Sequence, residues 1–227
     1  MPGLEKLCVI TIFLVLAACT SKKSAAPEVA SLPRSETGSV GNGRTLYKTC
    51  APCHGDKGEG NASLHSPGLA NIEGWYAYRQ LKNFKAGLRG FLSQDSSGAQ
   101  MALVAQTLDT TEMLDLIAYV ETFADLKMNT HAAGDVKKGE RTYQTVCGSC
   151  HGPGAKGNIL MQAPGLNGLE PWYLKVQIAK FKTSLRGAHP RDVYGAQMVP
   201  MVALLKDEQS VDDVVAYIQS ITPIATK

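Results

Sequence analysis

The stretch Cys50-Ala51-Pro52-Cys53-His54 decides the organisation of this chain, and it occurs a second time as Cys147-Gly148-Ser149-Cys150-His151. In a C-x-x-C-H run the two cysteines can form thioethers to the vinyl groups of a haem, and the histidine that follows can bind the iron from one side. The sequence therefore predicts two covalently attached haems, one held by Cys50, Cys53 and His54 and the other by Cys147, Cys150 and His151.

C-x-x-C pairs are also typical of zinc sites and of thioredoxin-like dithiols. The two pairs of a zinc ribbon are separated by about 15–20 residues, whereas these pairs are 97 residues apart. A redox dithiol does not need a histidine directly after its second cysteine. Haem attachment explains more of the motif, and zinc and dithiol chemistry are the alternatives.

Each motif is followed at the same distance by a methionine in a Gly-Ala-Gln-Met context. His54 and Met101 are 47 residues apart, and so are His151 and Met198. A thioether sulfur can ligate haem iron, so Met101 and Met198 are the predicted ligands on the opposite face. Iron that is bound on both faces has no open coordination position, which favours one-electron transfer over oxygen or peroxide chemistry.

The chain also repeats itself outside the motifs, at an offset of 97 residues. Three matches show the extent of the repeat: Pro67-Gly68-Leu69 with Pro164-Gly165-Leu166, Trp75-Tyr76 with Trp172-Tyr173, and Leu88-Arg89-Gly90 with Leu185-Arg186-Gly187. The alignment starts with Arg44 on Arg141 and needs no gap up to Leu108, after which the second copy has one extra residue. We predict two domains, at 38–127 and 134–227.

Apolar residues recur at helical spacing in each copy, and no stretch alternates like a strand, so the predicted fold class is all-α. Helices are expected over about 41–53, from Trp75 onwards, and after the capping signal Asp109-Thr110-Thr111-Glu112. Glycine and proline predict loops over 55–72, 86–100, 152–169 and 183–200.

The N-terminus predicts export. Residues 7–18 form an apolar run that is shorter than the ~20 residues of a membrane-spanning helix and is typical of a signal peptide. Leu16-Ala17-Ala18-Cys19 resembles the bacterial lipobox. This resemblance implies that residues 1–18 are removed and that Cys19 carries a lipid anchor on the periplasmic side. An ordinary secretory signal is the alternative, and residues 19–37 are a predicted flexible tether.

Composition excludes several classes of protein. With 44% hydrophobic and 19% charged residues, the chain is typical of a soluble globular protein. A net charge of +3 is too small to indicate nucleic acid or another polyanion as partner. Residues 38–127 hold 8 Lys and Arg against 9 Asp and Glu, whereas residues 134–227 hold 11 against 8. We hypothesise that this asymmetry orients docking to two partners; a scatter of solvated charges is the alternative.

Each copy resembles a class I cytochrome c domain: an N-terminal helix ending in C-x-x-C-H, a proline loop, a middle helix, a methionine loop and a C-terminal helix containing Ala-Tyr. The tandem arrangement resembles the dihaem cytochromes c of bacterial respiratory chains, the c-four type. The resemblance implies an electron carrier, not an enzyme, that operates between a quinol-oxidising complex and a terminal oxidase or reductase. A haem subunit of a larger membrane complex and a dihaem peroxidase are the alternatives.

The resemblance also implies roles for residues around each haem. Pro67 and Pro164, each 13 residues after the motif histidine, would accept a hydrogen bond from its second ring nitrogen and orient the ring. The candidates for holding the haem propionates are Trp75, Trp172, Arg89 and Arg186, because indole and guanidinium N–H groups donate well to carboxylates. Turn prolines and core tryptophans are the simpler interpretations.

Overall fold

The computed structural model describes residues 38–124, 126 and 132–221. Its regular elements are helices, and the only β-type pairings among these residues are the isolated bridges Asn61–Ser66 and Asn158–Ala163. The predicted signal peptide, the tether and Cys19 lie outside the described residues. Within the described ranges, no helix has the length and apolar character needed to cross a membrane.

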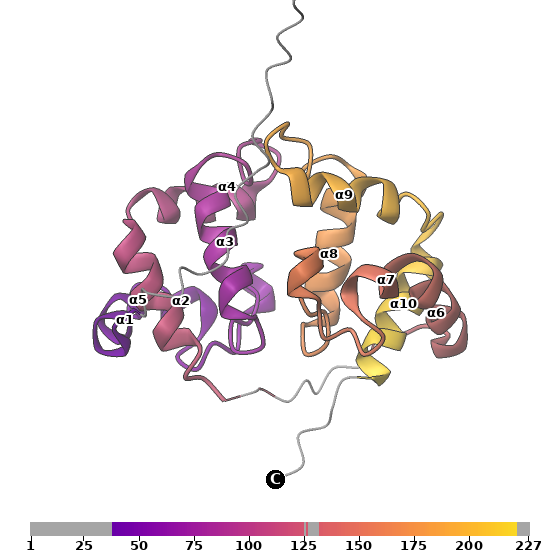
Figure 1. Cartoon of the computed structure of the whole chain (residues 1–227), viewed down its shortest axis with the longest axis horizontal. Helices are drawn as coiled ribbons and strands as arrows, with labels where there is room; N and C mark the ends of the chain where they lie inside the picture. Colours follow the sequence, from indigo (N-terminus) through magenta and orange to yellow (C-terminus); the bar gives the residue numbers. More distant parts are fainter. Residues whose placement is uncertain (1–37, 125, 127–131, 222–227) are drawn as a thin grey trace, which may run out of the picture.

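The helices form two halves in the same order. The first half contains α1 (Val40–Tyr47), α2 (Ala51–His54), η1 (Ala62–Leu64), α3 (Gly74–Lys85), α4 (Ser96–Gln106) and α5 (Thr110–Val120). The second contains α6 (Val136–Thr142), η2 (Tyr143–Cys147), α7 (Gly148–His151), η3 (Ile159–Met161), α8 (Pro171–Lys182), α9 (Val193–Val202) and α10 (Glu208–Ser220). Figure 1 shows the halves side by side, with α3 and α8 facing each other at the centre. The all-α duplication that the sequence predicted is confirmed.

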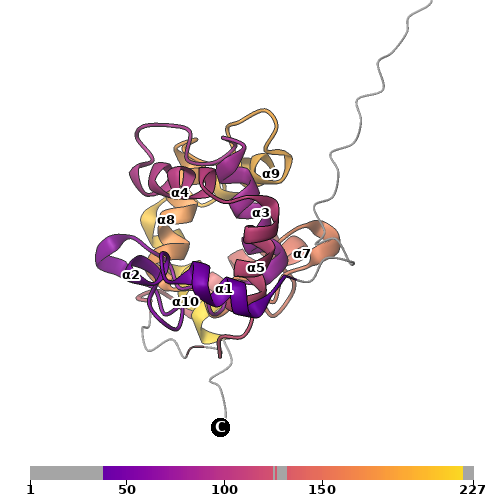
Figure 2. The same cartoon turned by 90° about the vertical axis from the view of Figure 1, so that its left-hand side faces the viewer.

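In each half the first helix crosses the last one in backbone contact. A Cβ atom on Gly43 would lie 1.9 Å from the carbonyl oxygen of Asp115, and one on Gly139 would lie 1.8 Å from that of Asp213. Only glycine allows this approach, so these two positions set how closely α1 packs on α5 (Figure 2) and α6 on α10 (Figure 1).

The aspartates at these crossings also bind the start of each domain through their side chains. Asp115 accepts the N–H of Ser39 at 2.6 Å, and Asp213 accepts the N–H of Asp135 at 2.7 Å. The predicted capping signal is present as well, because Asp109 and Glu112 form a reciprocal capping box at the start of α5. Apolar residues of α5 and α10 then contribute to the two cores, among them Met113, Leu116 and Ile117 in one and Val214, Val215 and Ile218 in the other.

The structure corrects the ungapped alignment before the second motif. The hydroxyl of Tyr47 donates to the carbonyl of Gly55 at 2.8 Å, and that of Tyr143 donates to the carbonyl of Gly152 at 2.7 Å. Tyr143 is therefore the counterpart of Tyr47, at an offset of 96 instead of 97. The extra residue is accommodated in the π-helical turn Tyr143–Cys147. Pairing Arg44 with Arg141 was wrong by one position.

Two predictions of helix boundaries also need correction. The helix expected over 41–53 is divided into α1 and α2. Both candidate methionines lie inside helices, not in loops, because Asp95 and Asp192 cap α4 and α9 by accepting the N–H groups of Gly98 and Gly195. At these positions glycine belongs to the cap: a Cβ on Gly98 would lie 2.1 Å from the Asp95 carboxylate.

Candidate functional site

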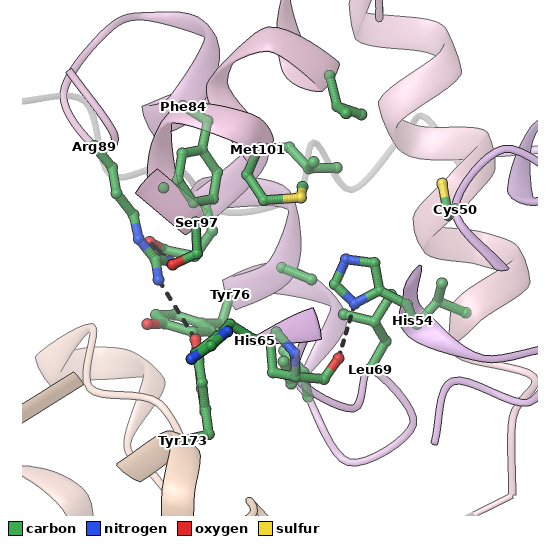
Figure 3. A pocket seen from close by; sticks show the side chains of 18 of the residues that line it. Cys50, His54, His65, Leu69, Tyr76, Phe84, Arg89, Ser97, Met101 and Tyr173 are labelled. Carbon is green, nitrogen blue, oxygen red and sulfur yellow. Dashed lines mark hydrogen bonds between the residues drawn. The ribbon is translucent and has the colours of Figure 1, made fainter. Parts of the chain in front are cut away.

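Each half encloses a cavity bordered by its motif histidine and its candidate methionine. The first cavity, counted together with the solvent space at its mouth, measures about 1070 Å³, and Figure 3 shows the imidazole of His54 and the thioether of Met101 reaching into it, with Cys50 nearby. The second, counted in the same way, measures about 1650 Å³ and is bordered by His151, Met198 and both motif cysteines. Most other lining side chains are apolar. The structure thus brings the predicted iron ligands of each half to one cavity.

Both motif histidines are oriented by a proline carbonyl. Nδ1 of His54 lies 2.8 Å from the carbonyl oxygen of Pro67, and Nδ1 of His151 lies 2.7 Å from that of Pro164. A carbonyl can only accept, so Nδ1 carries the proton and Nε2 keeps its lone pair for a metal. Burial lowers the pKa of both imidazoles, although the proline contacts oppose it. The neutral, ligating form therefore dominates at neutral pH.

Burial of two of the four motif cysteines, Cys50 and Cys147, disfavours their thiolate forms. None of the four is in a disulfide bond. Burial raises the pKa of Cys50 and raises that of Cys147 to about 11. A zinc site or a reactive dithiol needs thiolates. Moreover, among the described residues no three His, Cys, Asp or Glu side chains cluster as a metal site.

The two cavities meet at an interface of buried polar side chains. Arg89 donates to Gln80 at 2.9 Å and to Gln177 at 3.0 Å, and Arg186 donates to Gln177 at 2.7 Å and to Gln80 at 3.1 Å. Each arginine also reaches a tyrosine of the other half: Arg89 donates to Tyr173 at 3.5 Å and Arg186 donates to Tyr76 at 2.6 Å (Figure 3 shows the first). The contacts obey an approximate two-fold relation between the halves.

This interface holds buried cations that lack anions. Arg79, Arg89 and Arg186 are 6%, 6% and 7% exposed, and in the described part of the chain no carboxylate lies within 4.0 Å of any of them. Burial alone raises the pKa of Tyr76, but the neighbouring guanidinium groups outweigh it and lower the pKa. Since buried charges are normally paired, the two carboxylates of a haem in each cavity fit what these residues lack.

The four propionate candidates occupy different places. Arg89 borders the first cavity and Arg186 the second, each in its own half. Trp172 borders the cavity of the other half, and Trp75 borders neither cavity; instead its ring packs against the guanidinium of Arg79 at 4.9 Å. The arginines are therefore better placed than the tryptophans to hold propionates.

A reciprocal pair of glutamates was not predicted from the sequence. Glu73 accepts the N–H of Gly165 at 2.7 Å, and Glu170 accepts the N–H of Gly68 at 2.5 Å. Both glycines directly follow a histidine-orienting proline, so each half fixes the proline loop of the other. Burial raises the pKa of Glu170, although hydrogen bonds from the backbone of Glu170 itself and of Gly68 oppose the rise. Only the arrangement of the two halves shows this role.

Comparison with known proteins decides the family. The sequence profile of cytochrome c matches residues 40–124 and 136–222. The chain belongs to the cytochrome c family. The reduced cytochrome c4 of Pseudomonas stutzeri is similar in structure, with a TM-score of 0.59 and 25% identity over 80% of this chain and 98% of that one. Thiosulfate dehydrogenase (TsdBA) of Marichromatium purpuratum gives a TM-score of 0.61 and 27% identity over 79% of this chain and 39% of that one.

Two characterised sequences are also similar to this cytochrome c. The "thiosulfate dehydrogenase electron acceptor" of Stutzerimonas stutzeri is 27% identical over 74% of this chain and 82% of its own. The cbb3-type oxidase subunit FixP of Sinorhizobium medicae is 26% identical over 72% of this chain, which spans 57% of that protein. The two C-x-x-C-H motifs, one in each cytochrome c domain, bind two covalently attached haem c groups, and the protein is an electron-transfer cytochrome.

Proposed function

We propose that this cytochrome c is a membrane-tethered one-electron carrier that passes electrons from a quinol-oxidising complex to a terminal oxidase or reductase. One observation carries the proposal: in each half a histidine and a methionine border the same cavity. Haem c supplies a one-electron couple, and ligation by His and Met raises its potential. If the histidine and the methionine of each half both held the iron, no coordination position would be left for a substrate.

The arrangement of the cavities supports transfer between the haems. The first cavity is bordered by Trp172 and Tyr173 of the second half, and the second by Tyr76 and Gln80 of the first. Each cavity therefore extends to the interface between α3 and α8, which would favour electron transfer between the haems that the two cavities would hold. An electron received in one half can leave from the other.

The N-terminal segment completes the proposal, although it lies outside the described residues. A lipid on Cys19 would hold the protein at the membrane, and the tether 19–37 would have an r.m.s. reach of roughly 25 Å by random-coil scaling. A domain that moves over this range can alternate between membrane complexes without diffusing away.

The relatives favour a second donor. The Stutzerimonas stutzeri protein, of which the chain covers 82%, is an electron acceptor of thiosulfate dehydrogenase. A periplasmic dehydrogenase could therefore reduce this cytochrome in place of the quinol-oxidising complex. The likeness to FixP favours a third arrangement, in which the protein is a fixed subunit of an oxidase.

The test uses the full-length haem-loaded protein in vesicles. We expect two haems per chain, no carbon monoxide binding to the reduced protein, rapid reduction by one of the two donors, and rapid oxidation by an oxidase. Met101→Ala is the control, because it should open one iron to carbon monoxide. Carbon monoxide binding by the parent would support the peroxidase alternative, and co-purification with an oxidase in fixed stoichiometry would contradict a shuttle.

A further inference from the structure

The two halves differ at a pair of matched positions on the facing helices. On α3 these positions are Arg79 and Asn83, one turn apart; on α8 their counterparts, 97 residues later, are Val176 and Lys180. Arg79 and Asn83 border the second cavity, whereas Val176 and Lys180 border the first. Each helix thus sends one cation towards the cavity of the other half, but from a different turn.

Arg79 is held so that one of its nitrogens, Nε, has no hydrogen-bond partner among the described residues. Its two Nη atoms donate to Gln162, one to the side-chain oxygen at 2.8 Å and one to the backbone carbonyl at 2.9 Å. The guanidinium carbon lies 4.9, 5.2 and 5.0 Å from the ring centres of Trp75, Tyr76 and Tyr194. Nε is buried without a hydrogen-bond partner among the described residues. Such a donor costs free energy unless a ligand pairs with it.

The acidic groups that border the second cavity have other partners. Glu73 accepts the N–H of Gly165, and Asp192 caps α9. Neither lies within 4.0 Å of Arg79. Burial lowers the pKa of Arg79, although Tyr76 opposes it, and an anion in the cavity would also favour the charged form.

Lys180, the cation that α8 sends towards the first cavity, differs from Arg79 in having an acidic partner. Its ammonium group donates at 2.5 Å to Asp95, which is 2% exposed, and at 2.7 Å to Ser97. The charge that reaches the first cavity is therefore already paired within the protein, while the charge of Arg79 is not.

We propose that Arg79 of the first domain binds a propionate of the second domain's haem. The Nε–H of Arg79 would donate a hydrogen bond to that carboxylate. The contact joins the two domains through a cofactor covalently bound to only one of them. This inference rests on the two covalent haems and not on the donor or acceptor, so an error about the partners leaves it intact.

The test measures the potentials of both haems in the full-length protein. A positive charge beside a haem stabilises its reduced form. Arg79→Gln should therefore lower the reduction equilibrium constant of the second haem about tenfold, ~59 mV for a one-electron couple. Arg79→Met should do the same while keeping the apolar contacts. Arg79→Lys, which keeps the charge, should recover most of the loss. A Met101→His background moves the first haem to lower potential and isolates the second titration.

Lys82→Gln is the matched control, because it removes the same charge from the exposed face of the same helix. Lys82→Gln should change the reduction equilibrium constant of either haem by no more than about twofold. Two results would overturn the proposal: equal shifts of both haems in Arg79→Gln, or no selective shift of the second haem in any charge-removing variant. A purely structural contact with Gln162 predicts the same potentials in Arg79→Met and Arg79→Lys.

Discussion

Substituting Gly43 by alanine should weaken the first domain more than any other single-methyl change in α1. The new Cβ would lie 1.9 Å from the carbonyl oxygen of Asp115, whereas ordinary contact begins at 3.4 Å, so α1 would have to move about 1.5 Å away from α5. Overpacking costs about 1–3 kcal/mol, and here no side chain can rotate away. Displacement also breaks the bond from Ser39 to Asp115, worth about 1 kcal/mol, and alanine regains about 1 kcal/mol of helix propensity.

The last two terms cancel, so the expected net loss is about 1–3 kcal/mol. It is measured by urea unfolding of the haem-loaded protein, followed by far-UV circular dichroism. Gly41→Ala is the control in the same helix: its Cβ would meet only the Ser39 hydroxyl, at 3.8 Å, so it should stabilise by about 0.5–1 kcal/mol. The packing argument fails if Gly43→Ala unfolds within about 0.5 kcal/mol of the parent.

Three further outcomes are expected. Tyr47→Phe removes the 2.8 Å bond to the carbonyl of Gly55 and should cost about 1–2 kcal/mol in urea unfolding; an unchanged midpoint would contradict it. The N–H of Asp135 and the amide of Gln209 lower the pKa of Asp213. The ionised Asp213 therefore stabilises the folded state fully above about pH 4, and this stabilisation is lost as pH falls through the lowered pKa. The unfolding midpoint of Asp213→Asn should depend less on acid than that of the parent; parallel pH profiles would refute this. If the charge asymmetry steers docking, partner reduction should slow with salt and respond to charge reversal in one domain; rates indifferent to both would exclude steering.

The sequence was sufficient where chemistry requires particular residues at particular spacings. The 47-residue distance joins a histidine and a methionine that border the same cavity, and the 13-residue distance joins a histidine to the proline carbonyl that it contacts. The cavity shared by His54 and Met101 could be predicted because both copies repeat the 47-residue distance, whereas the contact between His54 and Pro67 was implied by the resemblance to class I cytochrome c domains. Spacing within one domain is thus informative.

Predictions failed where several local patterns fit the same residues. The glycines and polar residues before the methionines predicted loops. In the structure Asp95 caps a helix by accepting the N–H of Gly98, three residues after it, so Met101 lies inside α4. A one-residue insertion inside a helix left Arg44 aligned with Arg141, since a π-turn absorbs it without any glycine or proline signal. Arg79 and Glu73 were missed because their partners are 83 and 92 residues away, in the other half.

The interface explains which differences between the copies are tolerated. Under an approximate two-fold relation, a contact from one half to the other implies the reverse contact, and Arg89–Gln177 with Arg186–Gln80 and Glu73–Gly165 with Glu170–Gly68 obey this. A change at any of these positions alters two contacts or leaves a buried group unpaired, so both copies retain the same residue. Arg79 and Lys180 instead contact side chains that differ between the halves, Gln162 and Ser97, whose counterparts are His65 and Tyr194. Positions of this kind are therefore where two haems built from one repeated domain can acquire different surroundings.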